Sequence, residues 1–349
     1  MFKEETVIVI GAGASAEFGL PTGRDIFNHI AVPENPTRSS DLKELTGRYG
    51  AFDQNFERFY KKRSVSQFDT SDLDFLLSMG RQGYHGSIDL LAIRNPSIIK
   101  IAKILCSWSI LSKMYSRTEG QVEGYRATHP PIVYKMNSFW RNPRIGGYNN
   151  WIGTIAEKFL REANTIEDLE ENKLSIVSFN YDTIFLDALT HFVTLDEIFQ
   201  DLPHEIIPKV HHVFGELPPI QSVIKRNDIV EYAQNIKFME EVASKRPNSI
   251  EVIRNKVSSA KKILLVGFDC HRKNTDLIGL NETGADIYAI NYNGNEELKI
   301  RLIEGLGLAE KHIMSGTIEN PIGASKAFDM GFLSFAERFS SHYLAGMIV

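Results

Sequence analysis

Cysteine and excess basic charge are both lacking in this chain of 349 residues. Cys106 and Cys270 are its only cysteines, so it cannot build a zinc module on four cysteines. Two isolated cysteines are also typical of a reducing compartment, and we therefore expect a cytoplasmic protein. The formal net charge of -5 is unlike the basic surplus of most nucleic-acid binders, so no direct nucleic-acid binding is expected.

Long apolar runs are missing as well. No segment approaches the length of a membrane span, and the first residues, MFKEE, do not resemble a signal peptide, so we expect no membrane association. With 43% hydrophobic and 24% charged residues, the composition is that of a globular protein. Its length suits one large domain or two smaller ones.

What the chain does contain, near its start, is a short apolar strand followed by a glycine turn. Residues 6–10 read TVIVI and predict a buried strand, and residues 11–22 read GAGASAEFGLPT. Gly11 and Gly13 permit a sharp turn and a close approach of the backbone to a ligand. A helix opening at Ala14 would direct its free amide groups and its dipole toward a pyrophosphate. The Gly-x-Gly-x-x-Ala spacing fits a dinucleotide-binding loop.

The segment after this loop departs from a conventional dinucleotide fold. Such a fold has a second strand that ends in an acidic residue about 20 residues further on. Here residues 31–41 read AVPENPTRSSD, with two prolines and no apolar run, which disfavours an oxidoreductase. From residue 42 onward, apolar residues recur at spacings of three and four, as in helices. We therefore expect residues 31–174 to form a mostly helical insertion.

Short apolar runs separated by helical segments return after residue 174. They predict a parallel sheet with further strands at residues 174–179, 210–214, 263–268 and 286–290. Ligands of such sheets bind beyond the carboxyl ends of the strands, and polar residues follow each of these strands, including a loop expected over residues 269–274. The predicted fold is α/β with a Rossmann-like parallel sheet, built from residues 1–30 and 175–349.

Four motifs at these strand ends, taken in order, resemble the sirtuin-like superfamily of NAD-consuming enzymes. They read GAGASAEFGLPTG, SFNYD, HHVFGEL, and LLVGF with a downstream INYN. More narrowly, they are similar to the bacterial branch that serves in antiphage defence as NAD hydrolases. The resemblance covers roughly residues 1–24 and 174–295, and it implies a sirtuin-like Rossmann-type domain.

The resemblance implies three groups of NAD-binding residues. One group lines the phosphates, a second belongs to a loop that closes over the nicotinamide half, and a third lies on the adenosine side. These are, in that order, Gly11, Ala12, Gly13 and Ser15; Gly19, Pro21 and Thr22; and Gly267, Phe268 and Asn291.

The implied catalytic residues are Asn180, Asp182 and a histidine. The first two match the Asn and Asp of a strand end that reads Q-N-x-D in the family and contacts the nicotinamide and its ribose. The histidine is His211 or His212. The family often shows His directly before Gly, whereas here Phe214 occupies that position, which leaves the choice open. We favour His212, which shares a strand face with Phe214.

The chemistry of NAD cleavage suits these residue types. Breaking the N-glycosidic bond builds positive charge at the anomeric carbon while neutral nicotinamide leaves. A site for this reaction needs an anionic or dipolar group near the ribose, a group that positions water, and a base that works near neutral pH. Asp182 can supply the first, Asn180 the second and a histidine the third. No metal is required.

The resemblance therefore implies an NAD hydrolase that acts as an abortive-infection effector. Because NAD depletion is toxic, we expect control by homo-oligomerisation or by a partner, such as an ATPase or a phage-sensing protein. Two alternatives stay open. One is an NAD-dependent protein deacylase, which the lack of a zinc module disfavours, and the other is a sensor that binds NAD or ADP-ribose without turnover.

Each motif also has a purely structural interpretation. Asn180 and Asp182 are favoured residues at helix starts, so they could simply cap the helix that follows. A histidine pair at a strand end is more often structural than catalytic. Residues 291–294 read NYNG and would form a good turn without any ligand.

Overall fold

The structure is a computed structural model of the chain, and its description covers parts of residues 1–290. The described residues are 1–16, 20–23, 26, 70–82, 87–115, 151–194, 197–200, 202–203, 205–219, 229–245 and 247–290. They fall into two units. The first draws on residues 1–20, 113–223 and 239–349, and the second on residues 21–112 and 224–238. Residues 31–174, expected as one insertion, contribute to both units.

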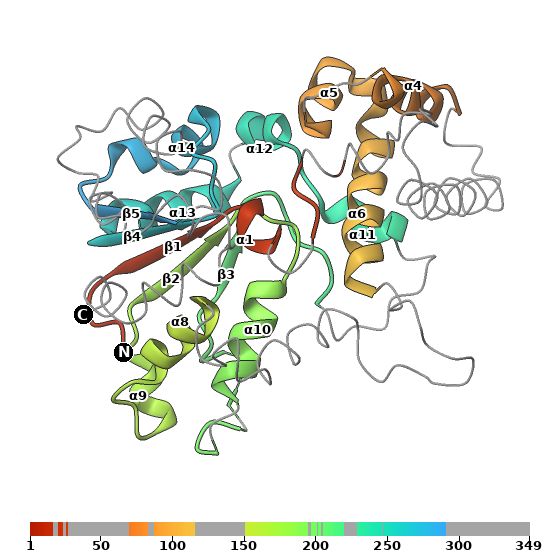
Figure 1. Cartoon of the computed structure of the whole chain (residues 1–349). Coiled ribbons are helices and arrows are strands. Elements are labelled where there is room, and N and C mark those ends of the chain that lie inside the picture. The colour runs from red at the N-terminus through yellow and green to blue at the C-terminus, as the bar shows by residue number, and fades with distance from the viewer. Residues whose placement is uncertain are drawn as a thin grey trace, which may run out of the picture. The chain divides into compact units, whose positions relative to one another are not determined.

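Five parallel strands form the sheet of the first unit (Figure 1). They are β1 (Thr6–Ile10), β2 (Leu174–Ser178), β3 (Val210–His212), β4 (Lys262–Val266) and β5 (Asp286–Ile290). Their order across the sheet is β3-β2-β1-β4-β5. The expected α/β architecture with a parallel, Rossmann-like sheet is confirmed, and each of the five strands lies where the sequence predicts one.

The central strand, β1, is buried on both faces. Its Ile8 pairs with Ile176 of β2 on one side and with Leu264 of β4 on the other. Residues 7–10 are each at most 2% exposed, which explains why the strand is apolar without alternation. The chain continues to β2 and β3 on one side of β1 and later to β4 and β5 on the other. A ligand crevice is expected at such a switch point, beyond the carboxyl ends of the strands.

Helices surround the sheet in the first unit. They are α1 (Ala12–Ala16), α8 (Trp151–Leu160), α9 (Ile166–Glu170), α10 (Ile184–Val193), α12 (Met239–Lys245), α13 (Asn248–Ser259) and α14 (Arg272–Ile278), followed by the 3-10 turn η4 (Leu280–Glu282). The apolar side of α13, which carries Ile250, Ile253 and Val257, shares one hydrophobic core with Val7 and Val9 of β1.

Helix α14 corrects the loop expected over residues 269–274. The loop is shorter because the Asp269 carboxylate accepts a hydrogen bond from the His271 amide at 3.1 Å, and the helix begins at the next residue. Thr275 and Ile278 are buried on one side of this helix. It ends at Gly279, whose φ of 71° is the left-handed conformation that glycine adopts at helix ends.

The described residues of the second unit form helices. They are α4 (Thr70–Arg81), α5 (Ile88–Arg94), the 3-10 helix η1 (Pro96–Ile98), α6 (Ile99–Tyr115) and α11 (Ile229–Asn235). Helices α4 and α6 lie in the segment after residue 42 where the spacing of apolar residues predicted helices. Along α6, Ile101, Leu105 and Cys106 are at most 2% exposed and belong to the apolar interior of this unit.

Candidate functional site at the carboxyl edge of the sheet

The glycine turn after β1 packs its backbone directly against the turn after β4. The Gly11 amide donates to the Val266 carbonyl at 2.9 Å, and the Gly13 amide donates to the Gly267 carbonyl at 3.0 Å. A Cβ on Gly11 would lie 2.6 Å from the Phe268 Cα, and one on Gly13 would lie 3.0 Å from the Gly267 Cα. Both positions therefore need glycine for packing alone.

The turn after β4 also needs glycine, because its backbone packs against the same contact. Gly267 has a φ of 57°, and a Cβ there would lie 2.8 Å from the Gly13 Cα. The Phe268 ring does not face an open crevice. It is 2% exposed and packs on the Phe179 ring, with centroids 4.8 Å apart, so the described contacts of this side chain are core contacts.

Asn180, just beyond β2, connects the glycine turn with the rest of the site. Its Nδ2 donates to the Gly11 carbonyl at 3.0 Å and to the Ser15 Oγ at 2.7 Å. Because a carbonyl can only accept, the amide orientation is fixed with the nitrogen toward Gly11. The Asn180 Oδ1 is then left buried without a hydrogen-bond partner.

Asp182 continues this chain of hydrogen bonds. Ser15 accepts from Asn180, and its hydroxyl donates to the Asp182 carboxylate, which also accepts from the Ile184 amide at 3.1 Å. Burial raises the pKa of Asp182, while the hydrogen bonds from Ser15 and Ile184 and the nearby His212 oppose that rise. The structural interpretation also holds in part, because the bond to Ile184 caps the start of α10.

His212, the last residue of β3, is oriented by the backbone of Asn180. Its Nδ1 lies 2.9 Å from the Asn180 carbonyl oxygen, which can only accept, so Nδ1 carries a proton. In the neutral ring the lone pair is then on Nε2. This atom is buried without a hydrogen bond, and the Glu216 Oε2 lies 3.4 Å away, within ion-pair range. The geometry leaves Nε2 as the basic atom.

His211 is in a different environment. It is half-buried, and its pKa is lowered by burial first and then by Lys209, Lys256 and His212. Adjacent residues of a strand point to opposite faces of the sheet, so only one of the two histidines can share the Asn180 side. The hydrogen bond to Asn180 belongs to His212.

The sequence-predicted residues divide by location. Those that meet at this edge of the sheet are Gly11, Gly13, Ser15, Asn180, Asp182, His212 and Gly267. Ala12 is exposed and is the first residue of α1, so this helix begins two residues before the expected Ala14. Pro21 and Thr22 belong to the second unit, and Gly19 and Asn291 lie outside the described residues.

Glu216 was not predicted as part of the site. It lies in the HHVFGEL motif, four residues after His212, but its sequence position gives no sign of its direction. The backbone on either side of it is held by hydrogen bonds from Val213 to Ser178 and from Leu217 to Tyr181. The role of the Asn180 carbonyl was also missed, because a backbone group leaves no signal in the sequence.

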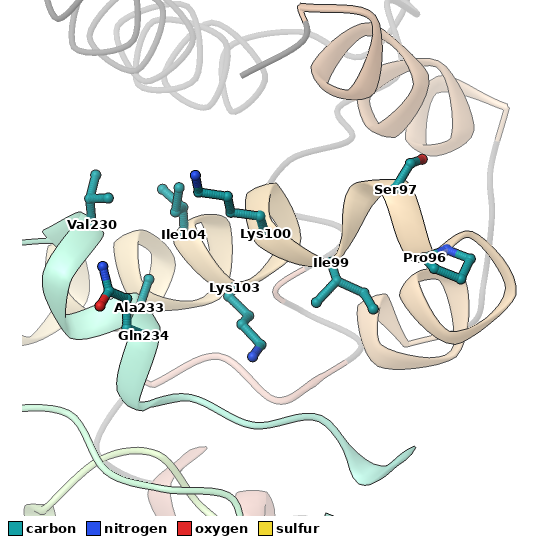
Figure 2. A pocket seen from close by; sticks show the side chains of 9 residues that line it. All are labelled: Pro96, Ser97, Ile99, Lys100, Lys103, Ile104, Val230, Ala233 and Gln234. Carbon is teal, nitrogen blue, oxygen red and sulfur yellow. The ribbon is translucent and has the colours of Figure 1, made fainter. Parts of the chain in front are cut away.

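A hollow lies within the second unit, between α6 and α11 (Figure 2). Its volume is about 490 Å³. Figure 2 shows Lys100 and Ile104 projecting from one side of α6 and Ile99 and Lys103 from the other, so the two ammonium groups do not converge. None of the 9 lining residues is acidic or a histidine, and lysine is the one ionisable residue type among them.

Neither a cluster of metal ligands nor a membrane-spanning helix occurs within the described ranges. Among these residues, no three His, Cys, Asp or Glu side chains are grouped so that they could hold a metal ion. None of the helices within the described ranges combines the length and the apolar character that a bilayer crossing requires.

Comparison of the chain with models of protein families, with curated proteins and with solved structures found no match.

Proposed function

We propose that this chain is a sirtuin-like NAD glycohydrolase, which uses water to cleave NAD into nicotinamide and ADP-ribose. The resemblance of four strand-end motifs supports the proposal. So does their geometry, because Ser15, Asn180 and His212 share one hydrogen-bonded network beside the first glycine turn. The proposal would have had no structural basis if Asn180 and His212 lay far from that turn.

The observation that carries the proposal is a pair of unsatisfied polar atoms. The Asn180 Oδ1 and the His212 Nε2 are both buried without a hydrogen-bond partner. An unsatisfied buried polar atom costs about 1–3 kcal/mol, and such atoms are uncommon in native structures. Two of them on residues that hydrogen-bond to each other indicate a site where a ligand or water supplies the missing partner.

In the proposed reaction the chain's own groups have distinct roles. Asn180 holds the attacking water through its free Oδ1, and the His212 Nε2 accepts a proton from that water. Asp182 and the amide dipole of Asn180 stabilise the positive charge that develops at the ribose. As the water oxygen bonds to the anomeric carbon, the electron pair of the broken glycosidic bond neutralises the departing nicotinamide.

The proposal is tested by following the products from NAD. Purified protein is incubated with NAD, with and without an acetylated peptide, and nicotinamide and ADP-ribose are quantified by liquid chromatography. A hydrolase releases both products in equal amounts without peptide, whereas a deacylase forms acetylated ADP-ribose only with peptide. A raised melting temperature in NAD with no nicotinamide release would overturn the proposal and indicate a sensor.

The proposed biological setting is a cytoplasmic antiphage effector that works as a homo-oligomer or with an activating partner. The resemblance supports this setting, and the toxicity of NAD depletion gives a reason for control. The partner hypothesis predicts that the purified chain alone is slow and that co-purified ATPase or phage-sensing protein accelerates nicotinamide release. Full activity of the isolated chain, with no stimulation by any neighbour, would exclude a partner.

A further inference from the structure

The His212 imidazole has a charged neighbour that the proposed reaction does not yet use. The His212 side chain is 5% exposed, and its Nε2 lies 3.4 Å from the Oε2 of Glu216, whose side chain is 60% exposed. One carboxylate oxygen therefore lies beside the basic atom while most of the side chain contacts solvent. The titratable groups near His212 are Glu216, Asp182 and His211.

The backbone holds Glu216 in this position. Before it, the Val213 amide donates to the Ser178 carbonyl at 2.8 Å, and after it, the Leu217 amide donates to the Tyr181 carbonyl at 2.7 Å. Between them, Gly215 has a φ of 83°, in the left-handed region that favours glycine. The segment that carries Glu216 is thus anchored to the end of β2 on both sides, unlike a free surface loop.

We propose that Glu216 is a positioning residue for His212, an inference that rests on the proposed function. Its carboxylate stabilises the protonated His212 imidazole and passes the proton on to solvent. Without a proton on Nε2, the carboxylate faces a lone pair and gains nothing from the contact. With that proton, it faces a cation at ion-pair distance. The Asn180 carbonyl keeps Nδ1 protonated in both states, so only Nε2 changes.

The protons balance in this step. An O–H bond of the attacking water breaks as a bond between that proton and Nε2 forms, which leaves His212 as an imidazolium. The proton then leaves Nε2 for the Glu216 carboxylate and passes from there to bulk water. The neutral Nδ1–H tautomer is restored, and one proton is released for each NAD cleaved.

The test compares Glu216→Gln and Glu216→Asp with the wild type, and Glu205→Gln serves as the control at an exposed glutamate ahead of β3. Nicotinamide release from NAD is measured from pH 5.5 to 9. Loss of the carboxylate disfavours the imidazolium, which cannot accept a proton from water. The fall in rate on the acidic side of the pH–rate profile therefore moves to lower pH. We expect the ratio of the rates at pH 6 and pH 8 to rise by about threefold in Glu216→Gln. Glu216→Asp and the control keep ratios closer to that of the wild type.

A second readout does not depend on activity. Histidine-labelled protein is titrated by NMR, and the His212 ring signals are assigned by their absence in His212→Gln. The wild type is expected to show the Nδ1–H tautomer at pH 8, and Glu216→Gln is expected to become doubly protonated at lower pH than the wild type.

The two readouts separate the two proposals. Equal ring titrations in wild type and Glu216→Gln, or a rate reduced by the same factor at every pH, would overturn the role of Glu216. A wild type that releases no nicotinamide would overturn the proposed function, and the ring titration would still decide whether Glu216 acts on His212.

Discussion

The two halves of the sheet's carboxyl edge use their polar groups differently. On the β1–β4 side, the turns satisfy each other, because Gly11 and Gly13 donate their amide protons to carbonyls at the end of β4. On the β2–β3 side, the Asn180 Oδ1 and the His212 Nε2 are buried without partners. Both halves lie at the carboxyl edge of one parallel sheet, and among the described residues of this edge the unsatisfied side-chain atoms belong to the second half.

This difference shows which kind of strand-end motif is informative. A glycine turn resembles a phosphate-binding loop in sequence, yet here close backbone packing alone requires its glycines. Packing does not explain the two unsatisfied acceptors, since the Asn180 Oδ1 has no hydrogen-bond partner and the His212 Nε2 has only the Glu216 carboxylate nearby, at 3.4 Å. We therefore assign packing mainly to the β1–β4 half and chemistry mainly to the β2–β3 half. The predictions below test that division.

Gly267→Ala should have the largest effect, and it should act on stability. The added Cβ would overlap the Gly13 backbone, and the residue would have to keep a φ of 57°. We expect the free energy of unfolding to fall by about 3 kcal/mol or more, measured by denaturant titration. Gly284→Ala is the matched control, because a Cβ there meets nothing within 4 Å. Equal stability of the two variants would refute the packing role of the β1–β4 half.

Asn180→Ala should remove activity while the protein stays folded. It deletes two hydrogen bonds but also an unsatisfied oxygen, so we expect stability to change by about 2 kcal/mol or less. Nicotinamide release should fall by about 100-fold or more. Asn255→Ala, at an exposed residue of α13, is the control for both measurements. A folded Asn180→Ala variant with wild-type activity would remove the β2–β3 half from the chemistry.

Asp182→Asn should alter the pH dependence of stability. Because burial raises the pKa of Asp182, the folded state binds its proton more tightly than the unfolded chain. The wild type therefore loses stability as pH rises above the carboxyl's unfolded pKa of about 3.9. Asparagine abolishes this contribution, so the stability of Asp182→Asn relative to wild type should increase from pH 4 upward. Asp286→Asn, at an exposed position, should leave the slope unchanged, and an unchanged slope in Asp182→Asn would contradict the buried carboxyl.

His211→Ala should have the smallest effect. The ring is half-buried near Lys209 and Lys256, and the hydrogen bond to the Asn180 carbonyl belongs to its neighbour. We expect the rate of nicotinamide release to stay within about threefold of wild type, since no transition-state contact is lost. A loss comparable to that of Asn180→Ala would exchange the roles of the two histidines.

The fold was more predictable than the site. Strands β1, β2, β4 and β5 could be located because buried parallel strands are short apolar runs bounded by polar residues. Strand β3 reads VHH and is half-buried, and it was located as part of the run at residues 210–214. The helices between residues 229 and 259 were not predicted. Two of them, α11 and α12, have 7 residues each, which is too short for a clear helical period.

Within the site, residue types were predictable and directions were not. Asn180, Asp182 and a histidine could be proposed because their motifs resemble those of the sirtuin-like superfamily. Their meeting at one edge was expected because polar residues that follow parallel strands gather there. The unsatisfied atoms depend on which way an amide and an imidazole face, and Gly11 and the Asn180 carbonyl determine that through backbone contacts. Glu216 lies in the site because backbone hydrogen bonds hold the segment from Val213 to Leu217, and such bonds leave no signal in the sequence.

The central claim is that the β2–β3 half of the edge cleaves NAD, and the rate of His212→Ala tests it most directly. Nicotinamide release is measured for this variant and the wild type, with folding of both verified by their unfolding midpoints. The account predicts equal amounts of nicotinamide and ADP-ribose from the wild type and a loss of about 100-fold or more in His212→Ala. A folded His212→Ala variant that releases nicotinamide as fast as the wild type would contradict it.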